Sequence, residues 1–80
     1  MAAEIPEELL RKWREEDEEA RRIRRSEADW SFIEKQPPRI KAALKYYVEA
    51  GDIRRAAKLA GLSLDEFNEL RKKANIPVVC

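Results

Sequence analysis

The sequence has no histidine, a single cysteine and no long apolar run. Without histidine, a zinc site that combines cysteine and histidine ligands is excluded. The one cysteine, Cys80, is the last residue, and a disulfide within the chain is excluded as well. No apolar stretch approaches the roughly 18 residues that a membrane-spanning helix needs. The first residues also lack the basic and then apolar order of a secretory signal, so we expect a cytoplasmic protein.

Glycine and proline are scarce too, with two and four residues in a chain of 80. Hydrophobic residues make up 44% of the chain and charged residues 41%, and Ala, Leu, Glu, Lys and Arg dominate. This composition is typical of helices, so we expect an all-α fold. A chain this short holds at most one domain with a small core, and we expect it to associate with a partner or with itself.

Charge divides the chain into two parts. Residues 1–36 carry eight Lys/Arg and eleven Asp/Glu, whereas residues 37–80 carry nine Lys/Arg and five Asp/Glu. We predict a charged helical arm in the first part and a helix-turn-helix domain in the second. The basic balance of the second part is compatible with binding to nucleic acid.

The arm begins with a helix signal at Pro6, since proline is favoured at the first helical position. Apolar residues then recur at helical spacing, but a charged run from Arg14 to Glu19 interrupts them. This stripe consists of Ile5, Leu9 and Trp13, continued weakly by Ala20 and Ile23. Opposite charges four residues apart, such as Glu18 and Arg22, are expected to support a solvated helix.

Two interpretations of the end of the arm stay open. Ser26-Glu27-Ala28-Asp29 resembles a capping box and would start a second helix, with Trp30 and Ile33 facing inward. Alternatively, one long helix runs from Pro6 to Lys35. Gln36-Pro37-Pro38 ends the arm in either case, because a residue before proline is pushed out of the helical region.

The large apolar side chains of the arm are candidates for a partner interface, where tryptophan is a favoured anchor. These candidates are Leu9, Trp13, Ile23 and Trp30. The alternative is that both tryptophans cover the small core. In a heptad arrangement Glu16 and Glu27 fall on the same line as the candidates, which argues against a stable coiled coil.

Glycines and capping residues delimit three further helices in the second part of the chain. Gly51 and Gly61 supply left-handed helix ends, and Asn75 is a further left-handed terminator. The predicted ranges are 38–50, 53–60 and a last helix that Ser63-Leu64-Asp65-Glu66 opens with a full capping box. The inward residues are expected to be Ile40, Ala43, Leu44, Tyr47, Val48, Ile53, Ala56, Ala57, Ala60, Leu64, Phe67, Leu70 and Ala74.

The window from Ile53 to Lys72 fits the helix-turn-helix pattern. Ala57 is small enough for the point where two helices cross steeply, and Gly61 tolerates the positive φ of a sharp turn. The helix ends deduced from capping residues agree with this window. The pattern therefore predicts a helix-turn-helix supported by a third helix at 38–50.

In a DNA-binding version of this motif, the last helix enters the major groove. Asn68 would pair with adenine there, and basic side chains would bind phosphates. The candidate DNA-binding residues are Arg54, Arg55, Lys58, Ser63, Asn68, Arg71 and Lys72. Asp65, Glu66 and Glu69 would repel phosphates, so the alternative is a helix-turn-helix that serves only as a packing unit.

Several short motifs stand at fixed spacings between residues 43 and 78. They are Ala43-Leu44-Lys45-Tyr46-Tyr47, Gly51, Ala56-Ala57, Ala60-Gly61-Leu62-Ser63, Glu66-Phe67, Leu70 and Ile76-Pro77. This half of the chain resembles small prokaryotic VapB-like antitoxins of an uncharacterised family, and it is also similar to Fis-type helix-turn-helix domains. The resemblance implies a DNA-binding regulator, an antitoxin that represses its own operon and masks a toxin. Two departures are the charged N-terminal helix and Asn75, which stands where glycine is common.

Two hypotheses follow. The first is a DNA-binding helix-turn-helix protein, an antitoxin or small transcriptional regulator, whose arm makes a homodimer or contacts a toxin. The alternative is a protein–protein interaction module in which the helix-turn-helix is structural only. The sequence offers no nucleophile–base pair and no glycine loop that could cradle a phosphate, so we expect neither an enzyme nor a cofactor.

Overall fold

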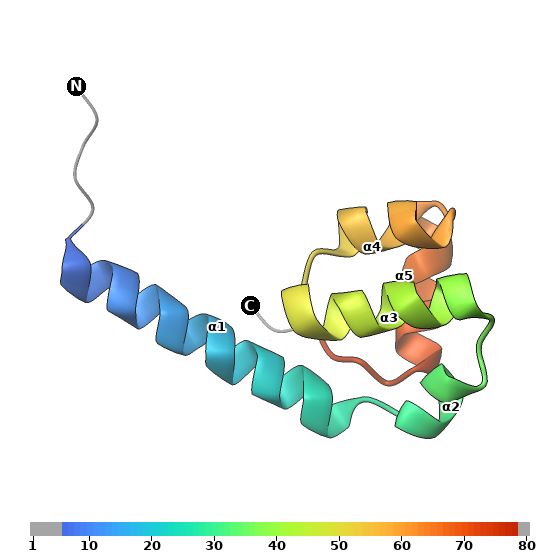
Figure 1. Cartoon of the computed structure of the whole chain (residues 1–80), viewed down its shortest axis with the longest axis horizontal. Helices are drawn as coiled ribbons and strands as arrows, with labels where there is room; N and C mark the ends of the chain where they lie inside the picture. The colour runs from blue at the N-terminus through green and yellow to red at the C-terminus, as the bar shows by residue number, and fades with distance from the viewer. Residues whose placement is uncertain (1–5, 79–80) are drawn as a thin grey trace.

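The computed structural model describes residues 6–78, which form five α-helices (Figure 1). The helices are α1 (Glu7–Glu27), α2 (Trp30–Glu34), α3 (Pro38–Ala50), α4 (Ile53–Ala60) and α5 (Leu64–Lys73). The all-α expectation is confirmed, and residues 6–78 contain no strand. The N-terminal half of α1 projects away from the packed helices, which gives the molecule its extents of 45 × 27 × 18 Å (Figure 1). No helix in this range combines the length and the apolar character needed to cross a bilayer.

The core forms around α3, which lies between the other helices (Figure 1). Its inward side chains Leu44 and Val48 are fully buried, and the ring of Tyr47 meets the ring of Phe67 edge-on at 5.9 Å. The largest fully buried side chains are Phe67, Ile33, Leu44, Ile76 and Val48. Burial of each such side chain contributes about 1.5–3 kcal/mol, so this small cluster supplies much of the driving force for folding.

Left-handed residues end three of the helices, as the sequence predicts. Gly51 has φ 70°, Gly61 has φ 72° and Asn75 has φ 56°. The capping box at the start of α5 is confirmed as well, with Ser63 accepting from the backbone N–H of Glu66 and Glu66 accepting from that of Ser63. Because these signals are local, they determine where each helix stops regardless of the packing around it.

The arm is two helices rather than one. Glu27 ends α1, Ala28 is extended with ψ 138°, and α2 begins after Asp29. The Asp29 carboxylate accepts a hydrogen bond from the backbone N–H of Phe32, so Asp29 is the capping residue. The predicted capping box at Ser26 is wrong, because Ser26 lies inside the last turn of α1.

The C-terminal end of α5 holds this break in place. The backbone N–H of Asp29 donates to the carbonyl of Ala74 at 2.8 Å, and the Asn75 amide donates to the carbonyl of Glu27 at 2.9 Å. Asn75 therefore adopts the left-handed conformation and also binds an unpaired carbonyl at the end of α1. A glycine could do only the first, which explains why asparagine stands there.

Packing extends into the predicted arm. Ala28 is 8% exposed and Ile33 is fully buried, and both belong to the core cluster. The ion pairs of Glu34 with Lys45 at 3.0 Å and with Lys41 at 3.5 Å join α2 to α3. The packed body therefore includes α2 and the end of α1 in addition to residues 37–78.

Some predicted side-chain positions are wrong. Trp30 does not face inward but is 39% exposed, and its indole N–H donates to the carbonyl of Arg25 at the end of α1. Leu64 is 45% exposed, because the first turn of α5 lies beyond the reach of the core. Within residues 6–78 the predicted pair Glu18–Arg22 does not form.

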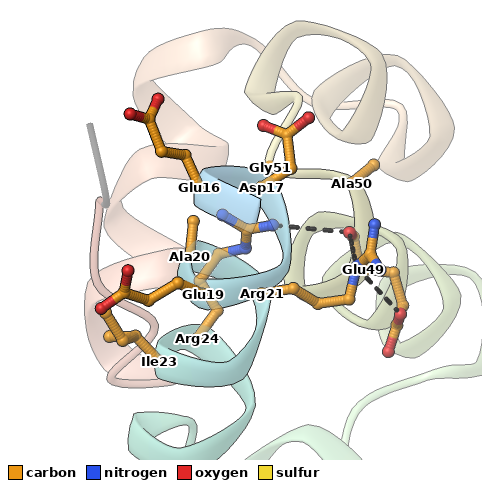
Figure 2. A pocket seen from close by; sticks show the side chains of 10 residues that line it. All are labelled: Glu16, Asp17, Glu19, Ala20, Arg21, Ile23, Arg24, Glu49, Ala50 and Gly51. Carbon is orange, nitrogen blue, oxygen red and sulfur yellow. Dashed lines mark hydrogen bonds and ion pairs between the residues drawn. The ribbon is translucent and has the colours of Figure 1, made fainter. Parts of the chain in front are cut away.

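Three arginines of α1 bind the C-terminal end of α3 instead, and Figure 2 shows two of them, Arg21 and Arg24. Arg24, only 6% exposed, donates from Nε to the carbonyl of Val48 at 2.8 Å and from Nη2 to that of Glu49 at 3.4 Å. Arg21 donates to the same Glu49 carbonyl at 2.9 Å, and Arg25 forms a two-pronged ion pair with the Glu49 carboxylate. The guanidinium of Arg24 also lies within 3.0–3.2 Å of the point that a Cβ on Gly51 would occupy. Positive charge is favourable there, because helix carbonyls carry partial negative charge at that end.

Arg24→Ala is expected to lower the free energy of unfolding by about 2–4 kcal/mol, since it removes charge-assisted hydrogen bonds and leaves a buried carbonyl without its partner. Urea denaturation followed by circular dichroism measures the change. The matched control is Arg22→Ala on the exposed side of α1, expected to shift stability by no more than about 0.5 kcal/mol. Equal effects of the two substitutions would contradict the role assigned to Arg24.

Gly61→Ala is expected to cost about 1–2 kcal/mol, because an L side chain is strained at φ 72° and its Cβ would lie 3.1 Å from the Arg39 guanidinium. Gly61→Asn is the comparison, since asparagine tolerates the left-handed region better. Thermal unfolding of both variants tests the order. An alanine variant as stable as the wild type would show that the turn does not need its positive φ.

Candidate nucleic-acid interface

The helix-turn-helix consists of α4, the turn at Gly61 and α5. The Asp52 carboxylate caps the start of α4 by accepting from the backbone N–H of Arg55 at 3.1 Å. After the last turn of α4, the N–H of Leu62 donates to the carbonyl of Ala57 at 3.0 Å, which closes the helix end. Ala57 itself is 2% exposed, as expected of a small residue where two helices meet. In Figure 1, α5 passes behind α3 and α4 at a steep angle.

The basic side chains of α4 face solvent. Arg54, Arg55 and Lys58 are all exposed, and within residues 6–78 their side chains form no hydrogen bond or ion pair. Three cationic groups without a protein counter-charge are available for an anionic ligand. These predicted residues therefore lie together on one short helix, at the position from which the first helix of the motif meets the phosphate backbone.

The predicted residues of α5 are more committed to the fold. The Ser63 hydroxyl caps the helix, and Arg71 donates to the Asn68 side-chain oxygen at 2.9 Å and to the Ile76 carbonyl at 2.7 Å. Lys72 is exposed and lies 3.4 Å from the Glu69 carboxylate. The structure therefore brings these residues together at α5. The guanidinium of Arg71, however, is already bound to groups of the protein.

Sequence reasoning missed Arg39. It lies in the first turn of α3, donates from Nε to the carbonyl of Leu59 at 2.7 Å, and keeps its guanidinium over Gly61. Its side chain is exposed and adds positive charge beside the turn. No local signal marks it, because Arg39 and Gly61 are brought together only by the packing of α3 against α4.

Carboxylates occupy the start of α5. Asp65, Glu66 and Glu69 are exposed, and hydrogen bonds from the Ser63 backbone and then from its hydroxyl lower the pKa of Glu66 below its usual 4.5. Glu66 is therefore ionised and turned toward the capping box, where it compensates the positive end of the helix. Asp65 and Glu69 stay exposed, where they would repel phosphates and accept hydrogen bonds from base amino groups.

A second surface lies on the arm. Leu9 is 38% exposed, Trp13 44% and Ile23 38%, on a helix whose N-terminal half touches no other helix in Figure 1. Trp30 is separated from these predicted interface residues by the break after α1. Ile5, the first residue of the predicted stripe, and Cys80 lie outside the described residues.

A groove of about 540 Å³ continues this surface between α1 and the end of α3 (Figure 2). Its walls are mostly charged, with Arg24 at the centre. The lining residues are Glu16, Asp17, Glu19, Ala20, Arg21, Ile23, Arg24, Glu49, Ala50 and Gly51. The sequence did not predict it, because the α1 and α3 walls come from separate parts of the chain.

The chain matches no family model, no curated protein and no solved structure. The functional argument therefore depends on the geometry and charge of its own residues.

Glu66→Gln is expected to change how stability depends on pH. Because folding lowers the pKa of Glu66, its ionised form stabilises the fold above the usual pKa of 4.5, and this contribution is lost as the pH falls below that value. The difference in unfolding free energy between wild type and Glu66→Gln should therefore be largest near neutral pH and shrink in acid. Urea unfolding at several pH values measures it, and a difference that stays constant from neutral to acid would contradict the assignment.

Proposed function

We propose that the protein binds double-stranded DNA through its helix-turn-helix. The observation that carries the proposal is the group of Arg54, Arg55 and Lys58 on the first helix of the motif, three exposed cationic side chains that have no hydrogen-bond or ion-pair partner within residues 6–78. Neutralising phosphates releases counterions, which is the main source of affinity in such complexes. Arg39 beside the turn and Lys72 and Lys73 at the end of α5 extend the cationic surface.

Contacts to bases would come from the first turns of α5. Asn68 accepts from Arg71 through its side-chain oxygen, which would leave the amide N–H₂ to donate to N7 of adenine. Leu64 is 45% exposed at the N-terminal end of the helix, where an apolar side chain suits a thymine methyl group. Asp65 and Glu69 would accept hydrogen bonds from cytosine amino groups. Their negative charge would also disfavour a position of α5 in which these side chains lie against phosphates.

The resemblance to VapB-like antitoxins supports a regulatory role within this proposal. An antitoxin needs a DNA-binding part and a second part that meets its toxin. The helix-turn-helix supports the first, and α1, with its exposed Leu9, Trp13 and Ile23, offers a separate surface for either a toxin or a second copy of the chain. In its broader form, the same proposal describes the protein as a small transcriptional regulator, without a toxin as its partner.

A protein-interaction module without DNA contact is the second candidate function. It is favoured by the exposed apolar residues of α1 and by the acidic groups at the start of α5, which weaken attraction to phosphates. Purification from the native host separates the candidates. A stable protein complex with no affinity for DNA would favour this second function.

Mobility-shift titration with the DNA upstream of the protein's own coding sequence tests DNA binding. We expect binding near 50 mM salt that weakens by roughly one power of salt concentration for each phosphate contacted. Arg54→Ala/Lys58→Ala should lower the salt slope by about two if each side chain binds one phosphate. The control, Arg11→Ala/Lys35→Ala, removes two exposed charges outside the motif and should leave the slope unchanged. Absence of binding at low salt would overturn the proposal.

A further inference from the structure

The exposed apolar residues and the groove lie along one face of α1. Leu9, Trp13, Glu16, Ala20 and Ile23 follow one another at spacings of three and four, so they lie on the same side of the helix. The N-terminal part of this face projects into solvent, whereas its C-terminal part forms a wall of the groove beside α3 (Figures 1 and 2). The N-terminal half of this face of α1 therefore exposes apolar side chains to solvent, and the C-terminal half lines the open groove.

Charges on α1 alternate in blocks that are complementary when the helix is reversed. Glu7 and Glu8 come first, then a basic block from Arg11 to Arg14, an acidic block from Glu15 to Glu19, and a basic block from Arg21 to Arg25. If two copies of α1 run antiparallel about a point near residues 14 and 15, each acidic block of one copy faces a basic block of the other. The entering segment is cationic where the groove walls carry Glu16, Asp17 and Glu19.

We propose that α1 pairs with α1 of a second copy as an antiparallel homodimer, each copy placing the segment from Leu9 to Arg14 in the groove of the other. Leu9 of one copy then packs on Ala20 of the second, and Trp13 packs beside Glu16 of the second. Beside this apolar line, Lys12 of one copy meets Glu19 of the second. The two-fold axis repeats every contact.

The position of Glu16 decides between the two possible directions of pairing. In a parallel pair, Glu16 of one copy would face Glu16 of the second copy in the apolar line, and the two carboxylates would repel each other there. Reversal places Glu16 opposite Trp13, whose indole N–H can donate to it. Glu16, one of the two glutamates that argued against a coiled coil, thus argues only against the parallel form.

Arg24 adds a second argument for this direction. In a parallel pair, Arg24 would have to pair with Glu19 of the second copy, but the Arg24 side chain is buried against the end of α3. The antiparallel pair uses Lys12 and Glu19, which are both exposed. Self-association would also stabilise the fold, because a single copy has a small core and pairing buries the apolar side chains of Leu9 and Trp13.

Charge reversal and rescue test the pair, with sedimentation equilibrium as the measurement and no DNA present. Lys12→Glu and Glu19→Lys should each weaken the dimer by about tenfold, because each places like charges together at two symmetric contacts. The double variant Lys12→Glu/Glu19→Lys should recover to within about threefold of the wild type. Lys12 and Glu19 are about 10 Å apart along one helix, so recovery reports a contact between copies.

Arg11 and Glu18 provide the matched control. They have the same spacing and carry the same charges but lie on the opposite side of α1 from Leu9 and Trp13. Arg11→Glu and Glu18→Lys should leave the dimer unchanged within about twofold. Equal weakening by both sets of variants, or a wild-type chain that remains monomeric near 1 mM, would overturn the proposal.

Cysteine cross-linking checks the direction of pairing in a Cys80→Ser background. Leu9→Cys/Ala20→Cys should form disulfide-linked dimers on oxidation, whereas Leu9→Cys alone should not. Positions 9 and 20 lie about 16 Å apart in one helix, too far for a disulfide within the chain. Cross-linking of Leu9→Cys alone would indicate a parallel pair and overturn the inference. The dimer does not depend on DNA binding, so failure here leaves the proposed function untouched.

Discussion

The placement of α1 against the other helices depends on the burial of one guanidinium at the end of α3. A charged group can be buried only where acceptors replace its water, and Arg24 finds these in the carbonyls of Val48 and Glu49. The carbonyls need donors as well, because the last turn of a helix leaves them unpaired. Gly51 allows the close approach, since a Cβ there would press on the guanidinium. One interaction therefore satisfies both partners and sets the direction in which the rest of α1 projects.

The same physical need is met at other helix ends. Arg39 from α3 donates to Leu59 at the end of α4, and Asn75 donates to Glu27 at the end of α1. In each case a polar side chain from another segment binds a carbonyl of the last turn. The chain then turns away through the left-handed Gly61 after α4 and through the extended Ala28 after α1. Short helices with few apolar residues gain much of their orientation in this way, because directional hydrogen bonds fix angles that a small core leaves loose.

The two proposed surfaces share this framework but have different chemistry. The helix-turn-helix presents Arg54, Arg55 and Lys58, which form no ion pair in the part of the chain that the structure describes, and this suits a polyanion. The face of α1 combines apolar side chains with blocks of both signs, which suits a protein helix of complementary pattern. Because Arg24 directs α1 away from α4 and α5, both surfaces can be occupied at once, and a dimer would carry two helix-turn-helix units.

The sequence by itself determined the ranges of α3 and α4, the capping box of α5 and the left-handed residues Gly51, Gly61 and Asn75. These features follow from neighbours within four residues, and local hydrogen bonds and backbone sterics decide them. It also predicted most of the inward faces and placed the three basic residues of α4 on one exposed helix. Apolar spacing alone indicates such faces, although it misplaced Leu64 and Trp30 at helix starts, where the core ends.

Only the tertiary structure decided the break at Ala28, the burial of Arg24, the position of Arg39 over Gly61 and the groove beside α1. Each joins residues between 20 and 48 positions apart. An arginine that caps a distant helix has the same local pattern as one that faces solvent, because charge and spacing do not reveal which carbonyl lies within reach. That information exists only once the helices have packed.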